Sequence, residues 1–158
     1  MTELDSQITS RDELVALIDD RWARWCHTVD NLTPEEIDTP GTCGHWSAKD
    51  LVGHVATWDQ VAIDNLQAIL QGKTRQPWDE TMDEFNERMA RSLEHEPFAS
   101  LRQMMDQTHA RLREVLDGAS GASDEQVQAM LESLPADTWE HYDVHRQQIV
   151  ERFGEPTA

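Results

Sequence analysis

Signals for the start of a helix recur along this chain, and they constrain its fold more than any other feature of the sequence. Ser10 and Ser123 each begin a capping box, in which a serine and the glutamate or glutamine three residues later bond free backbone N–H groups. Ser47 has the residue type favoured at a third helix start, and Pro135 suits the first turn of a last helix. Signals for β-strands are nearly absent. The sequence therefore predicts an all-α fold.

Apolar residues follow these starts at spacings of three and four residues, the pattern that lines one face of a helix. The pattern predicts helices from Ser10 to about Asn31, from Ser47 to about Gln71, from near Trp78 to Val115 with a bend at Pro97, from Ser123 to about Leu134, and from Pro135 to Phe153. Residues 33–46 contain two prolines and two glycines, so we expect a loop with at most one helical turn at Pro34–Ile37. Four main helices with such stripes pack most simply as a four-helix bundle, and we expect residues 1–158 to form a single domain.

The charge of the chain is strongly one-sided, with 31 acidic and 13 basic residues and a formal net charge of −18. A field of this sign repels phosphate backbones and anionic lipid surfaces, so we expect neither nucleic acid nor a membrane as a partner. The N-terminus lacks the basic start and the apolar run of a signal peptide, which favours a cytoplasmic protein. Cys26 and Cys43 are too few for a disulfide framework, and we interpret both as free thiols.

Three of the seven histidines have positions that fit a shared metal ion. His141 and His145 are four residues apart, so on a helix their rings leave the same face about one turn from each other. His54 lies beside the apolar stripe of the second predicted helix and should point inward or along a seam. Three neutral imidazoles leave coordination positions for water, as in catalytic zinc sites. The spacing alone also fits two hydrogen-bonded or exposed histidines, so both interpretations stay open on that ground.

Two stretches of the sequence resemble a known family. Residues 43–60, CGHWSAKDLVGHVATWDQ, are similar to the second-helix signature of the ClbS/DfsB branch of DinB-like proteins, and residues 139–149, WEHYDVHRQQI, resemble its counterpart near the C-terminus. The resemblance implies an up-down-down-up bundle, often a homodimer, with a divalent metal ion at one end, commonly zinc or nickel. It also implies that the metal ligands are His54, His141 and His145.

The resemblance further implies chemistry on a small electrophilic substrate, because DinB-like relatives include thiol-dependent isomerases and transferases as well as ClbS-like hydrolases. An open metal position can lower the pKa of a bound water, or it can hold a low-molecular-weight thiol as the thiolate. Either nucleophile attacks an electrophile. Hydrolysis also needs a carboxylate that moves protons, and the candidates are Asp50, one turn before His54, and Glu140 beside His141.

Several other residues are candidates for the lining of a ligand pocket. Arg21 and Asn86 interrupt apolar stripes, so each could orient a polar ligand; alternatively, Arg21 reaches solvent and Asn86 bonds a buried backbone group. Trp46 and Trp58 either wall a cavity or belong to the core.

The remaining histidines and cysteines are weaker candidates. Cys43 and His45 flank the start of the second predicted helix, but they lack the CxxC pattern of a metal site. No partner at ligand spacing accompanies the other three histidines, so we expect surface or helix-face positions for His27, His95 and His109.

Three functions are compatible with these features. The preferred one is a metal-dependent enzyme that acts on a small electrophile by thiol transfer or by hydrolysis. The second is a non-catalytic protein that sequesters a reactive small molecule in the bundle and so confers resistance. The third is a structural module in which the metal ion only staples two helices together.

Overall fold

The computed structural model describes residues 8–74 and 77–157, and in this range the regular structure is helical apart from one isolated bridge between Cys43 and Trp46. The helices are α1 (Arg11–Asp30), α2 (Pro34–Asp38), α3 (Ala48–Leu70), α4 (Met82–Leu93), α5 (Phe98–Asp117), α6 (Asp124–Ser133) and α7 (Trp139–Phe153), with a 3-10 turn at Pro135–Asp137. The predicted all-α class is therefore confirmed.

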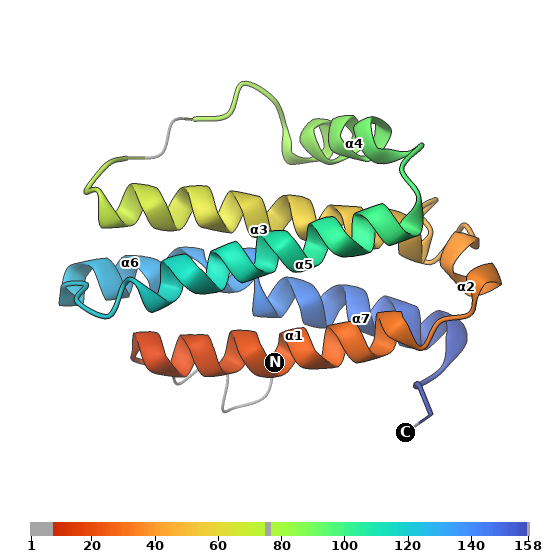
Figure 1. Ribbon diagram of the computed structural model, residues 1–158. Helices are drawn as coiled ribbons and strands as arrows, with labels where there is room; N and C mark the ends of the chain where they lie inside the picture. Colours follow the sequence, from red (N-terminus) through yellow and green to blue (C-terminus); the bar gives the residue numbers. More distant parts are fainter. Residues whose placement is uncertain (1–7, 75–76, 158) are drawn as a thin grey trace.

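Four long helices, α1, α3, α5 and α7, form the bundle (Figure 1). Helix α3 packs along α5, and α1 packs along α7. Following the chain colours, α1 and α7 run in one direction while α3 and α5 run in the other, which is the predicted up-down-down-up order. Because α3 and α5 are parallel, the chain must return along the bundle between them. Helix α4 lies on this return connection, outside α3.

Side-chain caps determine where most of the helices begin. The serine oxygens of Ser47 and Ser123 accept hydrogen bonds from the third residue of α3 and α6, and the side chain of that residue bonds back to the cap in each case. Thr33 and Thr81 form the same reciprocal capping box at α2 and α4. The start near Trp78 predicted for the third helical region was wrong, because the cap lies at Thr81 and α4 begins one residue later.

The last predicted helix is also shorter at its start than expected. Pro135 begins a separate 3-10 turn, and Thr138 follows it with φ −121° and ψ −106°, outside the helical region. The Thr138 hydroxyl donates to the backbone carbonyl of Leu134 at 2.7 Å, which satisfies the end of α6. As a result α7 begins at Trp139 and is a separate helix from α6.

Helix α3 is the central element of the core, since most of its side chains are buried. Its residues pack with buried side chains from α1, α5 and α7, among them Leu14, Ile18, Trp25, Met105, Leu112, Leu116, Tyr142 and Ile149. Gly53 lets α4 approach closely, because a Cβ atom there would lie 3.1 Å from Leu93 Cδ1. Among the described residues, no helix has the length and apolar character needed to cross a membrane.

Candidate metal centre

His54, His141 and His145 come together between α3 and α7. The Nε2 atom of His141 lies 3.0 Å from Nε2 of His54 and 2.9 Å from Nε2 of His145. The candidate ligand atoms of the three rings all lie within 4.8 Å of one another. The rings meet nearly edge to face, with centroids 4.4 to 4.9 Å apart. The structure thus joins the i, i+4 pair of the last helix to a histidine 87 residues away from His141.

The separation of these nitrogens fits ligands of one metal ion. Two nitrogens about 2.1 Å from a common ion lie about 3.0 Å apart when they subtend a right angle, and about 3.4 Å apart in a tetrahedron. The two observed distances, 2.9 and 3.0 Å, are close to the right-angle value. Zinc takes at least four ligands, so an ion held by these three rings would keep at least one coordination position for another ligand.

The protonation of the rings also fits a metal. Gln148 Oε1 lies 2.7 Å from His145 Nδ1, so this nitrogen carries the proton and Nε2 of His145 has its lone pair free. Burial lowers the pKa of His54 to about 3, with a further contribution from His145. Burial also lowers the pKa of His141 and of His145. The three rings therefore stay unprotonated at neutral pH. Neutral imidazole is also the form that binds a metal ion.

Two tryptophans and an asparagine surround the histidines. The ring of Trp46 lies 4.8 Å from that of His54, and the ring of Trp58 lies 6.3 Å from His54 and 6.0 Å from His141. The indole N–H of Trp58 donates to Asn86 Oδ1 at 2.9 Å, which ties α3 to α4. Asn86 and His54 line the same small pocket. Asn86 thus lines a pocket with His54, while Trp58, also predicted to line a pocket, packs beside His54 and His141.

A buried polar network holds α3 and α7 together beside the histidines. Tyr142, next to His141 in the sequence, donates its hydroxyl to Asp59 Oδ1 of α3 at 2.5 Å. His109 of α5 lies 3.1 Å from the other oxygen of Asp59 and stacks on Trp22 with ring centroids 3.6 Å apart. Asp59 and Tyr142 are fully buried, so their hydrogen bonds fix the position of α7 against α3.

The surface position expected for His109 was therefore wrong. Its side chain is buried, because it extends the apolar stripe Met105, Leu112 and Leu116 of α5. Spacings of four and three residues place His109 on this stripe, and Asp59 continues the buried face of Val55 and Ala62 on α3 in the same way. A histidine and an aspartate on two facing apolar stripes are the sequence signal that predicts such a buried pair.

The two carboxylates proposed to move protons have different environments. Asp50 lines the small pocket with His54, but its Oδ2 atom accepts bonds from the backbone N–H and the hydroxyl of Ser47 in the capping box of α3. Glu140 is half-buried and does not line the small pocket of His54.

The other candidate residues make different contacts. Arg21 donates to Asp143 Oδ2 at 2.8 Å, which forms an ion pair between α1 and α7. His45 is exposed and lies 3.5 Å from Glu87, and Cys43 is a free thiol beside Trp46. His27 and His95 are exposed, as expected.

Comparison with known proteins agrees with this architecture. A family model described as the DinB superfamily matches residues 17–158. The crystal structure of the colibactin self-resistance protein ClbS in complex with double-stranded DNA is similar to this fold, with a TM-score of 0.74 and 14% sequence identity. The alignment covers 96% of this chain and 99% of that chain. No curated protein matches this sequence significantly.

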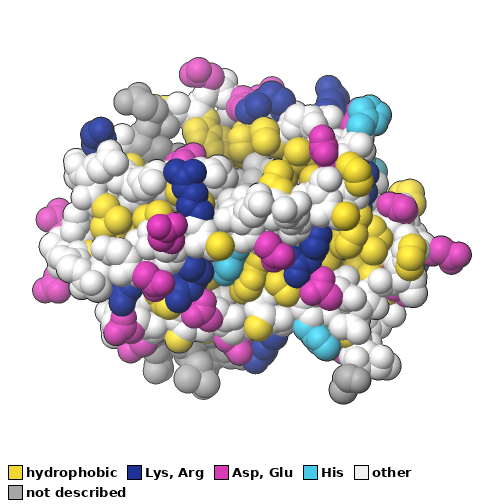
Figure 2. Space-filling model, viewed as in Figure 1, with side chains coloured by type: hydrophobic (Ala, Val, Ile, Leu, Met, Phe, Trp, Pro, Cys, Tyr) yellow, Lys and Arg dark blue, Asp and Glu magenta, His cyan; other side chains and the backbone are white. Residues whose placement is uncertain are grey.

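The exclusion of nucleic acid as a partner was wrong. It rested on the net charge of −18, yet a protein of similar fold has been crystallised with double-stranded DNA. Net charge is a sum over the whole surface, whereas contacts to a phosphate backbone depend on local groups. Basic side chains lie among the acidic ones on the face shown in Figure 2. Arg102 and Arg113 of α5, for example, pair with Asp30 and Asp19 of α1.

Proposed function

Because the chain belongs to the DinB superfamily, we propose that His54, His141 and His145 hold one divalent metal ion, zinc or nickel, in an enzyme that acts on a small electrophilic molecule. The observation that carries this proposal is the position of His141 Nε2, which lies 3.0 Å from His54 Nε2 and 2.9 Å from His145 Nε2. The lowered pKa values support it, because these rings are neutral and ready to bind a metal at neutral pH.

The side chains around the site support chemistry at an open metal position. When bound, the metal supplies a nucleophile, either hydroxide from a bound water or the thiolate of a low-molecular-weight thiol. Trp46 and Trp58 cover the histidines and limit the access of bulk water. Asp50 is the better candidate for accepting a proton, since it lines the pocket of His54 while Glu140 does not. Its bonds from Ser47 both reach Oδ2, which leaves Oδ1 to accept a proton.

Metal analysis of the purified, untagged protein tests the ligand set. We expect about one divalent ion per chain in the parent and little in the His141→Ala/His145→Ala double variant. His95→Ala is the matched control, because the His95 side chain is 93% exposed and far from ligand spacing. Equal metal content in the parent and the double variant would remove the site.

Activity assays then separate the two reaction types. Thiol transfer is followed with cysteine and 1-chloro-2,4-dinitrobenzene, and hydrolysis with 4-nitrophenyl acetate. We expect one of the two rates to rise above the uncatalysed rate in the metal-loaded parent, and to return to it after chelation or in the double variant. A rate that survives both treatments contradicts a metal-dependent enzyme.

A specific observation also favours the second candidate, a non-catalytic protein that sequesters a reactive small molecule. The chain has a cleft of about 780 Å³ that none of the three histidines lines, and a structure of similar fold is that of a self-resistance protein. Protection of cells against a reactive compound by the His141→Ala/His145→Ala variant, at the full level of the parent, would favour this function over the enzyme.

A further inference from the structure

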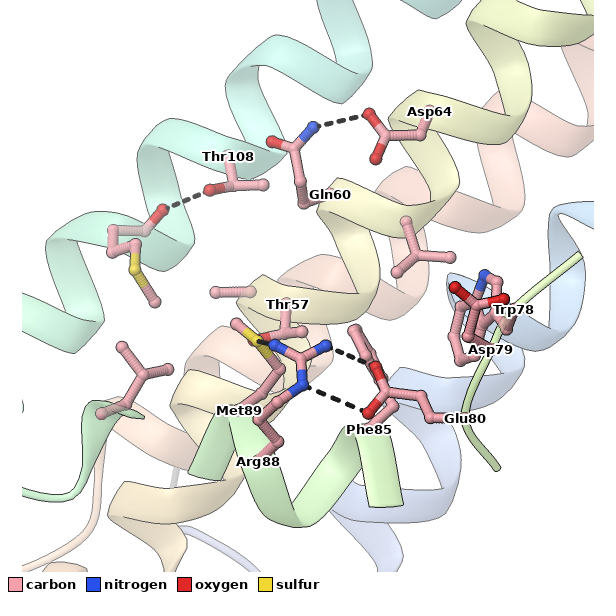
Figure 3. Close-up of a pocket in the computed structure, with 14 residues that line it drawn as sticks. Thr57, Gln60, Asp64, Trp78, Asp79, Glu80, Phe85, Arg88, Met89 and Thr108 are labelled. Atoms are coloured by element: carbon pink, nitrogen blue, oxygen red, sulfur yellow. Dashed lines mark hydrogen bonds and ion pairs between the residues drawn. The ribbon is translucent and has the colours of Figure 1, made fainter. Parts of the chain in front are cut away.

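A large cleft lies between α3, α4, α5 and the segment before α4 (Figure 3). Its volume of about 780 Å³ is in the range of sites for small organic molecules, which is roughly 300–1,000 Å³. Thr57, Gln60 and Asp64 line it from α3, while Phe85, Arg88 and Met89 line it from α4. It is therefore a candidate binding site distinct from the histidines.

This cleft lies next to the proposed metal centre. Thr57, Met89 and Leu93 line both the cleft and the small pocket to which His54 contributes. Trp58 lies between the two, because its ring is 6.0 Å from His141 on one side and 5.7 Å from Phe85 on the other. A molecule in the cleft is thus separated from the histidines by about one layer of side chains.

The wall nearest the histidines is aromatic and apolar. Trp78 and Phe85 lie with ring centroids 4.6 Å apart, and Trp58 continues this aromatic cluster behind them. The hydroxyls of Thr57 and Thr108 donate to carbonyls of their own helices, at 2.9 and 2.8 Å, so neither is free to donate to a ligand. This wall fits the hydrophobic body of a small molecule.

Most polar groups of the cleft are paired with one another, and two carboxylates keep free acceptor atoms. Arg88 donates twice to Glu80, which neutralises both charges, and the Gln60 amide donates to Asp64 at 3.0 Å. Figure 3 shows both interactions, with Asp79 apart from them beside Trp78. No ion pair or hydrogen bond holds the Asp79 side chain within the described residues, and Asp64 has only its neutral amide partner. Carboxylates without a cation beside an aromatic wall fit a positively charged ligand.

We propose that this cleft binds an organic cation with an aromatic or aliphatic body, in which the charged group lies near Asp64 and Asp79 and the body lies against Trp78 and Phe85. This inference goes beyond the proposed function, because a layer of side chains separates the cleft from the histidines and none of them lines it.

Two probes of the same shape and opposite charge test the proposal. Binding of benzyltrimethylammonium and of phenylmethanesulfonate to the full chain is measured by calorimetry at low salt. We expect the cation to bind and the anion to show no measurable binding. Equal affinity for both, or binding of neither, would overturn the proposal. The measurement is repeated in EDTA, where we expect cation binding to persist because no cleft residue belongs to the three histidines.

Substitutions locate the binding and control for the overall charge. Asp64→Asn and Asp79→Asn should each weaken cation binding about two- to five-fold, the effect of an exposed charge pair. Phe85→Leu should weaken it by a similar factor, about two- to five-fold, through loss of the aromatic face. Glu114→Gln on α5 changes the net charge equally but lies outside the cleft, so binding should be unchanged.

An equal loss of affinity in Glu114→Gln would mean that the cation responds only to the net charge, and the proposal would fail. Failure of the metal site is recognised separately. In that case the parent holds no metal, yet the cation still binds the cleft and depends on Asp64 and Asp79.

Discussion

Burial of His54 makes the stability of the metal-free chain depend on pH. Its pKa of about 3 in the folded chain lies below the value of 6.5 expected for an exposed histidine. The unfolded chain therefore binds more protons below about pH 6.5, and stability is lost as the pH falls. We expect His54 alone to remove about 2 kcal/mol of the unfolding free energy between pH 7 and pH 5.

Urea unfolding in EDTA at the two pH values measures this loss. The His54→Gln variant should lose less stability over the same pH interval, since it has no imidazole to protonate on unfolding. His95→Gln should behave as the parent, because the His95 side chain is exposed. Identical pH dependence in His54→Gln and the parent would show that His54 is not the source.

Gln148 orients one of the proposed ligands, and this role predicts an effect on metal affinity. Its Oε1 atom lies 2.7 Å from His145 Nδ1 and so directs the lone pair of Nε2 toward the other rings. We expect Gln148→Leu to lower metal affinity about 10- to 100-fold, whereas Gln148→Glu keeps an acceptor and retains affinity. Competition with a chromogenic chelator measures both values, with Gln147→Leu as the control because Gln147 bonds Glu151 instead. Unchanged affinity in Gln148→Leu would contradict this role.

The sequence predicted the residues of the histidine cluster better than it predicted the surrounding hydrogen bonds. The i, i+4 spacing of His141 and His145 follows from helix geometry, and the structure brings His54 to them. The pairing of Arg21 with Asp143 joins residues 122 positions apart, so only the three-dimensional fold reveals it. The cap role of Asp50 could have been inferred from its place three residues after Ser47.

At the scale of the elements, the bond from Tyr142 to Asp59 joins α7 to α3. Tyr142→Phe removes this donor, so Oδ1 of the buried Asp59 carboxyl loses the hydrogen bond from Tyr142. We expect a loss of about 1–3 kcal/mol in unfolding free energy. Chemical unfolding of Tyr142→Phe, Asp59→Asn and the double variant forms a mutant cycle that isolates the bond. Strictly additive losses in the cycle would contradict a direct interaction.

The presence of the helices could be predicted from local signals in the sequence, whereas the residues at which some of them begin could not. Periodic apolar residues and caps at Ser10, Ser47 and Ser123 located α1, α3 and α6. The start of α4 was missed because Trp78 continues the apolar pattern into the segment before the cap at Thr81. The break before α7 depends on the backbone of Thr138, and Pro135 is compatible with both a 3-10 turn and an α-helix.

At the scale of the whole molecule, the proposed metal ion joins α3 to α7 and should stabilise the fold. Binding only to the folded chain adds about 2.7 kcal/mol when the free metal is 100-fold above its Kd. For a chain of this length, that corresponds to a rise in Tm of roughly 5–11 °C. Thermal unfolding followed by circular dichroism, with metal and with EDTA, checks the rise. The His141→Ala/His145→Ala variant should show no difference between the two conditions, and an equal rise in that variant would contradict binding by these rings.

Global charge was the least informative property of the sequence for predicting partners. The net charge of −18 excluded nucleic acid in the sequence analysis, and the DNA complex of a protein with a similar fold overturned that exclusion. The fold class, in contrast, follows from short-range patterns that are repeated along the chain. Partner choice depends on which few side chains face the partner, and these are known only once the helices are placed.

Among the described helices of ten residues or more, only α4 has no buried residue, although it covers the cleft and carries Asn86. Its amide hydrogens should therefore exchange with deuterated solvent through small local openings, while the central amides of α3 exchange only when the entire bundle unfolds. A metal ion that bridges α3 and α7 would slow exchange in those helices and leave α4 fast. A molecule held in the cleft would protect α4 itself, so the exchange rates of this one helix report which of the two sites is occupied.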